Sequence, residues 1–271
     1  MAPERKYLGK VVVISGAAGG LGQAFARRWH QAGATLALLD LDGAAARRLA
    51  ADLGADQGRA LGLTCDVTRE ADCLAAVLEV VERLGGVDVL INNAGITQRS
   101  AFAATQSRVF RRVMDVNFFG SLYLTQAALP SLTARRGQIV VITSVAGFAP
   151  LLGRSGYAAS KHALHGLFGS LRAELAGSGV TVTLACPGFT QTGIATAALD
   201  GDGTVTSHPQ STVGRVSTPT EVAEAVFHAA QKDRPLAVFS AVGKLTWWVS
   251  RLAPNLYEKL MTRKLKHELQ R

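Results

Sequence analysis

The sequence contains no uninterrupted apolar segment as long as a membrane-spanning helix, which takes about 18 to 20 residues. Its first residues, MAPERKYLGK, are polar and lead directly into VVVIS, without the apolar region of a signal peptide. No internal repeat, low-complexity stretch or linker divides the chain. Because 48% of its 271 residues are hydrophobic and 18% are charged, we expect one large globular domain in the cytoplasm.

Cysteines and metal ligands are also sparse. The three cysteines, Cys65, Cys73 and Cys186, have neither metal-ligand spacing nor the even number of a disulfide framework, so we expect buried thiols in a reducing environment. His162 and His165 would lie on one face of a helix, but no third ligand accompanies them. We therefore predict no metal site.

The net charge of +9 is concentrated at the C-terminus. Residues 244–271 contain seven Lys or Arg against two Asp or Glu, which leaves only +4 for the rest of the chain. A basic globular surface that binds DNA is therefore a poor explanation of the charge, and we expect no nucleic-acid partner.

Short β-branched apolar segments alternate with longer segments of helical character. The predicted strands are Val11–Ile14, Thr35–Leu39, Ala60–Thr64, Val87–Ile91, Gln138–Ile142, Val180–Ala185 and Leu236–Phe239. The predicted helices are Leu21–Gln31, Ala44–Leu53, Glu70–Leu84, Ser107–Leu129, Tyr157–Ala176 and Pro219–Gln231. This alternation predicts an α/β fold, with a doubly wound parallel sheet of seven strands and helices on both faces, in one domain over residues 1–243. A Gly-, Thr- and Ser-rich loop, about 194–218, is predicted to form a flap.

A glycine-rich turn, SGAAGGLG (Ser15–Gly22), follows the first predicted strand and opens a helix. Such a turn lets the backbone approach a pyrophosphate, which the helix N-terminus then binds; an ordinary strand-to-helix turn is the alternative. Asp40 ends the second strand, where a carboxylate can accept both ribose hydroxyls of adenosine. Because this carboxylate would repel a 2′-phosphate and the turn contains no Lys or Arg, we predict NAD rather than NADP.

Six motifs in sequence order resemble the short-chain dehydrogenase/reductase family over residues from about 8 to 240. They are SGAAGGLG; CDV at Cys65–Val67; NNAG at Asn92–Gly95; Asn117; Ser144 thirteen residues before the YxxxK of Tyr157 and Lys161; and PGFTQT at Pro187–Thr192. The resemblance implies a Rossmann-type fold, an alcohol dehydrogenase or ketone reductase, and a homodimer or homotetramer that forms through the two long helices.

The resemblance also implies the site residues. The catalytic residues are Asn117, Ser144, Tyr157 and Lys161. Ser144 would stabilise the substrate oxygen, and Asn117 would position a water that relays the proton through Lys161. The cofactor-binding residues are Gly16, Gly19, Gly20, Leu21, Gly22, Asp40, Asp66, Val67, Asn93, Ala94, Gly95, Tyr157, Lys161, Pro187, Gly188, Thr190 and Thr192.

Tyr157 and Lys161 lie four residues apart, so on a helix their polar heads share one face. A phenol with a pKa near ~10 is a poor base at neutral pH, and lowering it by ~3 units takes ~4 kcal/mol. One positive charge about 4 Å away supplies energy of that order at an effective dielectric near 20. We therefore expect Lys161, with the positive nicotinamide of NAD⁺, to make Tyr157 the general acid/base.

Residues 244–271 form a basic extension that contains Trp247–Trp248 and then Pro254, which suits the first position of a helix. An amphipathic pattern follows from the leucines at 252, 256, 260, 265 and 269, with Lys259, Arg263, Lys264 and Lys266 among them. The extension resembles that of hydroxysteroid and retinol dehydrogenases. Three placements stay open: packing on a subunit, covering the substrate cleft, or peripheral contact with an anionic membrane.

The predicted substrate pocket is apolar. Its wall is expected to include Ala146, Phe148, Leu152, Phe189 and Ile194. This favours a lipophilic secondary alcohol and its ketone over a sugar phosphate or an acidic substrate, although Arg154 is close in sequence. A 3-oxoacyl-thioester reductase is the enzymatic alternative, but such enzymes usually prefer NADPH and lack this extension. A non-catalytic dinucleotide sensor is the other alternative, although sensors typically lack the Tyr or the Lys.

Overall fold

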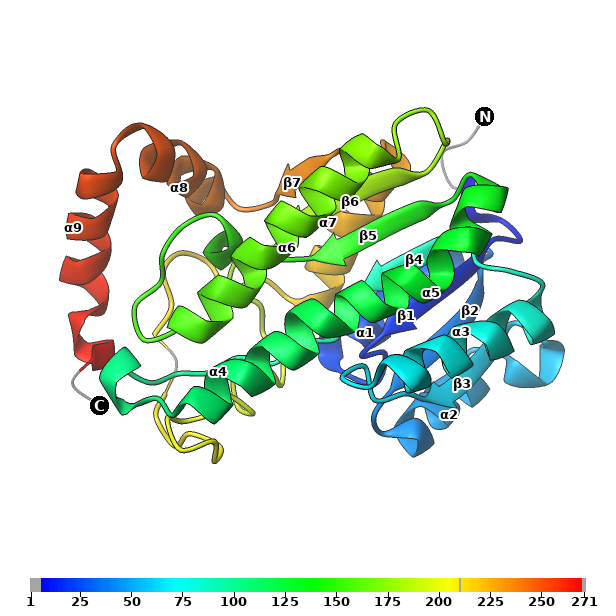
Figure 1. Ribbon diagram of the computed structural model, residues 1–271, viewed down its shortest axis with the longest axis horizontal. Helices are drawn as coiled ribbons and strands as arrows, with labels where there is room; N and C mark the ends of the chain where they lie inside the picture. The colour runs from blue at the N-terminus through cyan, green and yellow to red at the C-terminus, as the bar shows by residue number, and fades with distance from the viewer. Residues whose placement is uncertain (1–5, 210, 270–271) are drawn as a thin grey trace.

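The computed structural model describes residues 6–209 and 211–269, and within these bounds it forms one parallel sheet with helices on both faces (Figure 1). Residues 1–5, 210 and 270–271 of the predicted domain and extension, and the side chain of Leu269, lie outside the described residues. The strands are β1 (Val11–Ser15), β2 (Thr35–Asp40), β3 (Ala60–Thr64), β4 (Val89–Asn92), β5 (Gln138–Ile142), β6 (Thr181–Cys186) and β7 (Leu236–Val238). Their order is β3-β2-β1-β4-β5-β6-β7, which confirms the predicted seven-stranded doubly wound sheet.

The sheet grows in opposite directions from β1: β2 and β3 lie on one side of it, and β4 to β7 lie on the other. β1 pairs with β2 on one side (Val12 opposite Leu36) and with β4 on the other (Val12 opposite Val89), all in parallel. Crossover connections leave this point toward both edges of the sheet, and in sheets of this topology ligands bind outside the carboxyl ends of the strands at this point. The fold therefore places the glycine turn and the NNAG segment at the position where such sheets bind ligands.

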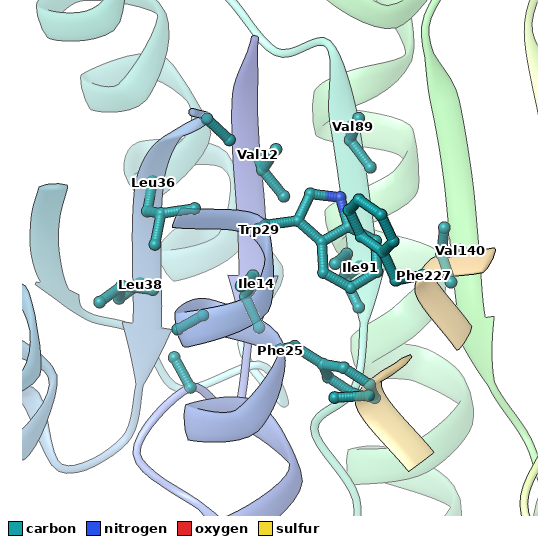
Figure 2. Packing of buried hydrophobic residues seen from close by; sticks show 14 of the residues in the cluster. Val12, Ile14, Phe25, Trp29, Leu36, Leu38, Val89, Ile91, Val140 and Phe227 are labelled. Atoms are coloured by element: carbon teal, nitrogen blue, oxygen red, sulfur yellow. The ribbon is translucent and has the colours of Figure 1, made fainter. Parts of the chain in front are cut away.

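Two hydrophobic clusters explain why the helices cover both faces. One face carries α1 (Gly20–Gln31), α2 (Gly43–Asp52) and α7 (Pro219–Gln231), and the other carries α3 (Glu70–Leu84), α5 (Gly120–Arg135) and α6 (Ser155–Glu174). On the first face the Trp29 ring lies 5.0 Å from that of Phe227, above the side chains of β1 and β4 (Figure 2). Strand side chains are thus buried on both sides, as continuous apolar strands require.

The predicted helix over residues 107–129 is wrong in its end point and its regularity. The structure has α4 (Ser107–Met114), a π-helical turn at Asp115–Phe119, and α5, which continues to Arg135. Pro130 does not end α5, because proline removes only one backbone hydrogen bond and this proline lies on the exposed side. The π turn inserts an extra residue per turn, which is common at functional sites, and it contains Asn117.

The C-terminal extension consists of two helices rather than one. They are α8 (Ala241–Leu252), which contains both tryptophans, and α9 (Pro254–Leu265), followed by a short 3₁₀ turn at Lys266–Leu269. Pro254 separates them because proline disfavours helical geometry at the preceding residue. The predicted boundary at residue 243 falls inside α8, whose start is marked by Ser240: its hydroxyl accepts a hydrogen bond from the backbone of Gly243 at 2.9 Å.

The extension packs on its own chain at the end toward which the strands point (Figure 1). The Trp247 ring lies 4.8 Å from that of Phe148, and the Arg251 guanidinium stacks over Trp247 at 3.2 Å. The Tyr257 hydroxyl donates to the carbonyl of Pro150 at 2.8 Å. No helix among the described residues is long and apolar enough to span a membrane.

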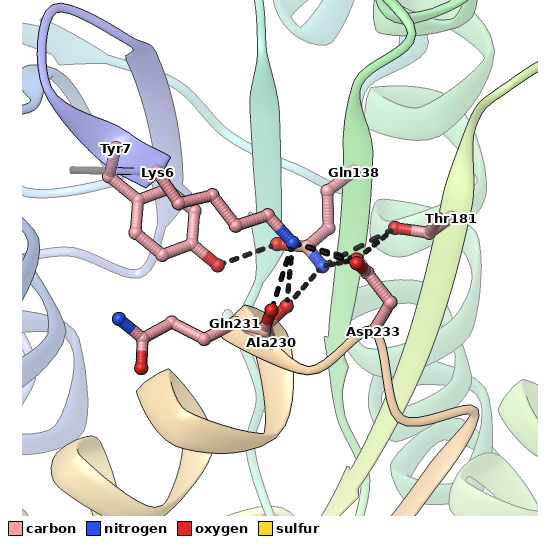
Figure 3. A network of polar contacts seen from close by, with 7 residues as sticks. All are labelled: Lys6, Tyr7, Gln138, Thr181, Ala230, Gln231 and Asp233. Carbon is pink, nitrogen blue, oxygen red and sulfur yellow. Dashed lines mark hydrogen bonds and ion pairs between the residues drawn. The ribbon is translucent and has the colours of Figure 1, made fainter. Parts of the chain in front are cut away.

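The amino ends of the strands are held by polar groups, of which Tyr7 and Gln138 are buried. Gln138, at the start of β5, accepts from the Tyr7 hydroxyl and donates to Asp233, which also pairs with Lys6 (Figure 3). These contacts join the N-terminal segment, the sheet and the end of α7.

Asp88 holds the same end of the sheet at the start of β4. Its carboxylate accepts from the backbone N–H of Val11 at 2.9 Å and pairs with Lys10 and Arg135 at 3.0 and 2.9 Å. Burial opposes the charge of Asp88, but the hydrogen bonds from Arg135, Val11 and Lys10 keep its pKa below the usual value. The carboxylate of Asp88 is therefore favoured in its ionised form in the folded protein.

We expect Asp88→Asn to lower the free energy of unfolding by about 1–3 kcal/mol at pH 7, because charge-assisted hydrogen bonds are lost in a buried position. A folded-state pKa below the unfolded value stabilises the protein above the unfolded pKa, and this contribution is lost as the pH falls through the folded pKa. Urea unfolding should thus show the difference from wild type shrinking below about pH 4, near the unfolded carboxyl pKa. Asp56→Asn, at an exposed position, is the control. A gap that is equal at pH 7 and pH 3 would contradict this account.

Candidate active site

The glycine turn after β1 has the geometry of a phosphate cradle. Gly16 has a φ of 62°, and a Cβ there would lie 2.9 Å from the Cα of Ala94. A Cβ on Gly22 would lie 2.1 Å from the carbonyl oxygen of Gly16, so both positions require glycine. Helix α1 begins after Gly19 without a side-chain cap, which leaves its first N–H groups available to an anion. These residues fit the pyrophosphate of a dinucleotide.

The NNAG segment after β4 fixes this turn. The Asn93 side chain donates to the carbonyls of Ser15 and Gly16 at 2.9 and 3.0 Å. The Ser15 hydroxyl in turn accepts from the backbone N–H groups of Asn93 and Ala94 at 3.0 and 3.1 Å. The motifs are far apart in sequence, yet each satisfies the polar groups of the other, so the cradle is preorganised.

Asp40 lies at the end of β2 beside the same turn. One carboxylate oxygen accepts from the Ala18 N–H at 2.8 Å, and the other accepts from the Asp42 N–H at 3.0 Å. Each oxygen keeps a second acceptor site, so the carboxylate can still bind hydroxyl groups. Asp66, after β3, folds back on Thr68 through two hydrogen bonds, and Val67 is buried against Gly120.

Tyr157 and Lys161 lie one turn apart on α6, with Ser144 after β5. The Lys161 ammonium is buried, donates to the Ile142 carbonyl at 2.9 Å, and lies 5.7 Å from the centroid of the Tyr157 ring. Burial lowers the pKa of Lys161 to about 8. Burial raises the pKa of Tyr157, although a hydrogen bond with Ser144 and the charge of Arg154 both oppose this rise.

The sequence-based expectation combines the charge of Lys161 with that of the oxidised nicotinamide. In the protein alone the pKa of Tyr157 is raised, and the positive charge that opposes the rise is that of Arg154. The reason is desolvation, because the interior disfavours the charged forms of both the phenol and the amine. The protein alone therefore holds Tyr157 as a protonated phenol at neutral pH.

Asn117 is placed beside Lys161 by the π turn. Its side-chain oxygen accepts from the Ile96 N–H at 2.8 Å, and its amide donates to the Ile96 carbonyl and to the Ser160 hydroxyl at 3.0 and 2.8 Å. A Cβ on Gly95 would lie 3.2 Å from the Asn117 oxygen and 3.6 Å from the Lys161 amine. The backbone at Gly95 thus brings the two side chains together, while the proton-relay role of Asn117 stays a prediction.

The PGFTQT segment follows β6 and approaches the start of α1. A Cβ on Gly20 would lie 3.5 Å from the methyl group of Thr192. The carbonyl of the buried Pro187 accepts from the Val145 N–H at 3.3 Å, and the Thr190 hydroxyl donates to the Gly188 carbonyl at 3.3 Å. The segment therefore connects the cradle to the loop that carries Ser144. Leu21, beside the cradle, packs on the core below.

The predicted pocket residues have different environments. Ala146 is buried, and Phe148 is buried in a small cluster with Trp247, so its ring supports α8. Leu152 and Phe189 are half-buried, and Ile194 is exposed. Their contact with a substrate stays a prediction.

The predicted flap is tied to the loop after β4. Leu199 pairs with this loop through backbone bonds to Thr97 and Arg99, and the Arg99 guanidinium donates to the carbonyls of Ala195 and His208. The loop also positions the catalytic helix, because the Gln98 side chain accepts from the Tyr157 N–H at 3.0 Å.

Sequence reasoning did not assign Gln98, Arg99 or Arg154 to the site. Arg99 and Arg154 are almost fully buried, each 6% exposed or less. The available signal was a charged residue in an otherwise uncharged stretch: QR follows NNAGIT, and the R of LLGRSGY stands three residues before Tyr157.

The histidines and cysteines have ordinary environments. His162 contacts the Ala158 carbonyl, and His165 contacts the Thr143 hydroxyl with a pKa that burial lowers to about 4. The three cysteines are free and buried, as predicted. Across residues 6–209 and 211–269, no three His, Cys, Asp or Glu side chains gather into a group that could hold a metal ion.

Comparison with known proteins bears directly on this site. A family model described as short chain dehydrogenase matches residues 10–202. The Bos taurus protein named dehydrogenase/reductase SDR family member 7B is 36% identical over 266 residues, which covers 95% of this chain and 82% of that protein.

Two solved structures share the fold. A short chain dehydrogenase/reductase from Burkholderia phymatum, in complex with NAD, has a TM-score of 0.81 at 27% identity and covers 92% of this chain and 95% of its own. The 3-ketoacyl-(acyl-carrier-protein) reductase from Brucella melitensis, complexed with NADH, has a TM-score of 0.74 at 26% identity and covers 85% and 96%.

Proposed function

This chain belongs to the short-chain dehydrogenase/reductase family of nicotinamide-dependent oxidoreductases, and we propose that it interconverts a lipophilic secondary alcohol and its ketone with NAD(H). The observation that carries the proposal is the convergence of three groups at the carboxyl end of the sheet. The Ser144 side chain lies close enough to Tyr157 to lower the pKa of the phenol, and the Lys161 amine lies 5.7 Å from the centroid of the Tyr157 ring, close to Gly95 beside the cradle.

The chemistry follows from the protonation states. In ketone reduction the protonated phenol of Tyr157 donates its proton to the carbonyl oxygen, while Ser144 stabilises the charge that develops there. In alcohol oxidation Tyr157 takes the hydroxyl proton. A bound dinucleotide would supply or accept the hydride, and its oxidised ring would bring a positive charge that favours the phenolate. Lys161, with a pKa of about 8, can exchange protons near neutral pH.

Tyr157→Phe is expected to lower kcat for ketone reduction by at least about 100-fold, because a positioned general acid contributes 10²–10⁴-fold. Steady-state kinetics at saturating ketone measure this effect. Tyr123→Phe, a half-buried tyrosine on α5, is the matched control and should retain wild-type turnover. Near-wild-type kcat in Tyr157→Phe would sink the mechanism. Dinucleotide binding with no turnover of any ketone or alcohol by the wild-type chain would favour the dinucleotide-sensor alternative.

The choice of NAD over NADP rests on Asp40. The turn holds its carboxylate at the end of β2, where a 2′-phosphate would meet like charge. The solved relatives from Burkholderia and Brucella contain NAD and NADH, which supports the same choice.

We expect kcat/KM to be at least about 10-fold higher with NADH than with NADPH, a difference of about 1.4 kcal/mol. Asp40→Ala should reduce this preference, mainly through KM for NADH, because the ribose hydroxyls lose their acceptor. Asp52→Asn, an exposed acid at the end of α2, should keep it. A wild-type preference for NADPH would overturn the assignment.

A 3-oxoacyl thioester is the second candidate substrate class. The Brucella relative is named as such a reductase and was solved with NADH, so the cofactor does not separate the two candidates. Its likeness covers 85% of this chain, less than the 92% covered by the Burkholderia structure. Comparing a simple lipophilic ketone with an acetoacetyl thioester decides between them.

We further propose that α8 and α9 contact an anionic membrane surface. An apolar row follows the outside of both helices: Leu245, Trp248, Leu252, Leu256 and Leu260, each 49–78% exposed. Exposed Lys244, Lys259, Arg263 and Lys264 accompany it, and this charge is complementary to acidic lipid. Trp247 faces inward, so the extension serves both its own chain and this outer surface.

Wild-type protein should co-sediment with phosphatidylserine-containing vesicles, and Trp248→Glu/Leu252→Glu should lose this binding because two charges enter the apolar row. Val205→Glu, an exposed flap position, is the control. We propose that the homodimer or homotetramer forms through α5 and α6. Light scattering without lipid measures its mass, which we expect to be the same in the variant as in the wild type. If the variant has a smaller mass than the wild type and both proteins bind vesicles equally weakly, the apolar row contacts a second copy of the chain instead of a membrane.

A further inference from the structure

Arg154 is a buried guanidinium beside the catalytic tyrosine. Arg154 is only 6% exposed. It lies immediately before α6 and three residues before Tyr157. Among the described residues it has no hydrogen bond and no ion pair within 4 Å; its guanidinium lies 5.9 Å from the centroid of the Phe189 ring. Phe189 belongs to the predicted pocket and Tyr157 is the proposed acid, so the charge of Arg154 lies near the place where a ketone would react.

A buried and unpaired guanidinium is costly. Removing such an ion from water costs several kcal/mol unless a counter-charge and hydrogen bonds compensate it. Burial lowers the pKa of Arg154, and the nearby Arg99 lowers it further, whereas Glu268 and Tyr157 oppose the shift. Buried ionisable groups with shifted pKa values are concentrated at functional sites.

The charged groups near Arg154 do not supply the hydrogen-bond acceptors that its guanidinium lacks. Arg99 is committed to the flap carbonyls, so it adds positive charge near Arg154. Glu268, from the C-terminal turn, is 5% exposed and attracts Arg154, but one of its oxygens accepts from the Ser211 N–H at 3.1 Å. Arg154 therefore experiences one positive and one negative neighbour, and within residues 6–209 and 211–269 none of its five N–H donors has a hydrogen-bond acceptor that an oxyanion would have to displace.

We propose that Arg154 binds an anionic group, a carboxylate or a phosphate monoester, on the lipophilic ketone that this enzyme reduces. The inference rests on the proposed function and narrows its substrate class, against the expectation of a neutral substrate. A planar guanidinium binds either oxyanion through two parallel hydrogen bonds, which would orient the carbonyl toward Tyr157 and Ser144. The apolar side chains at the same end of the sheet would contact the aliphatic part.

A different role is that Arg154 acts only on Tyr157, since its charge opposes the rise in the phenol's pKa. That role predicts equal effects of an Arg154 variant on neutral and anionic ketones. An anion-binding role predicts that the effect depends on the charge of the substrate and falls mainly on KM.

The experiment compares three ketones of similar length with NADH: 4-oxodecanoate, 4-oxodecyl phosphate and methyl 4-oxodecanoate. For the wild type we expect KM for one or both anions to be at least about 10-fold below that for the neutral ester. Arg154→Met should reduce this ratio to about threefold or less, and Arg154→Lys should restore part of it. Arg172→Met removes a charge from the exposed end of α6 and should keep the wild-type ratio. The anion with the larger ratio identifies the preferred group.

An equal KM for neutral and anionic ketones in the wild type, or an unchanged ratio in Arg154→Met, would overturn the inference. Calorimetry with decanoate, decyl phosphate and decan-1-ol separates it from the proposed function, because binding is read without turnover. Tighter wild-type binding of an anion than of decan-1-ol supports the subsite even if no ketone is reduced. Should Arg154→Met not fold, Glu268→Gln decides: loss of the competing carboxylate should tighten decanoate or decyl phosphate binding several-fold, and unchanged affinity would count against the subsite.

Discussion

The burial of one ammonium group constrains the rest of the site. Lys161 is 4% exposed and is held by the carbonyl at the end of β5. Such a charge is tolerated only where several groups fix its position. The π turn supplies Asn117, the backbone at Gly95 leaves space for both side chains, and Ser160 holds the Asn117 amide. The helix, the turn and the strand end must therefore meet at one point.

The same burial shifts the phenol and the amine toward their neutral forms. The pKa of Tyr157 is raised and that of Lys161 is lowered, so the protein by itself favours a protonated tyrosine beside an amine that can lose its proton near pH 8. This is the state that protonation of a ketone requires. Ionising the phenol depends on added positive charge, which an oxidised nicotinamide would bring and which Arg154 already provides in part.

The sequence predicted what depends on local pattern and short motifs. Parallel strands with buried faces, the glycine cradle and the YxxxK helix follow from residue type and spacing, and the structure has the predicted sheet. The sequence did not predict the π turn at Asn117, because a shift in the register of the helical hydrogen bonds does not require particular residue types. Nor did it predict the Arg99–flap contacts or the unpaired Arg154, since these depend on which loops meet across the sheet. It also did not predict that the pKa of Tyr157 is raised in the protein alone, because desolvation depends on burial, which a spacing argument does not measure.

Three segments that are far apart in sequence meet beside Tyr157. The Ser100 N–H donates to the Gly153 carbonyl at 2.9 Å, and a Cβ on Gly153 would lie 3.5 Å from that of Glu268. The loop after β4 thus fixes the start of α6, and the end of the extension covers it. The extension therefore contacts the chain at two places near the site: Trp247 packs on Phe148, and Glu268 lies beside Gly153, next to Arg154. A change in the extension would therefore reach the reacting centre through Glu268 and Arg154, without touching the cofactor cradle.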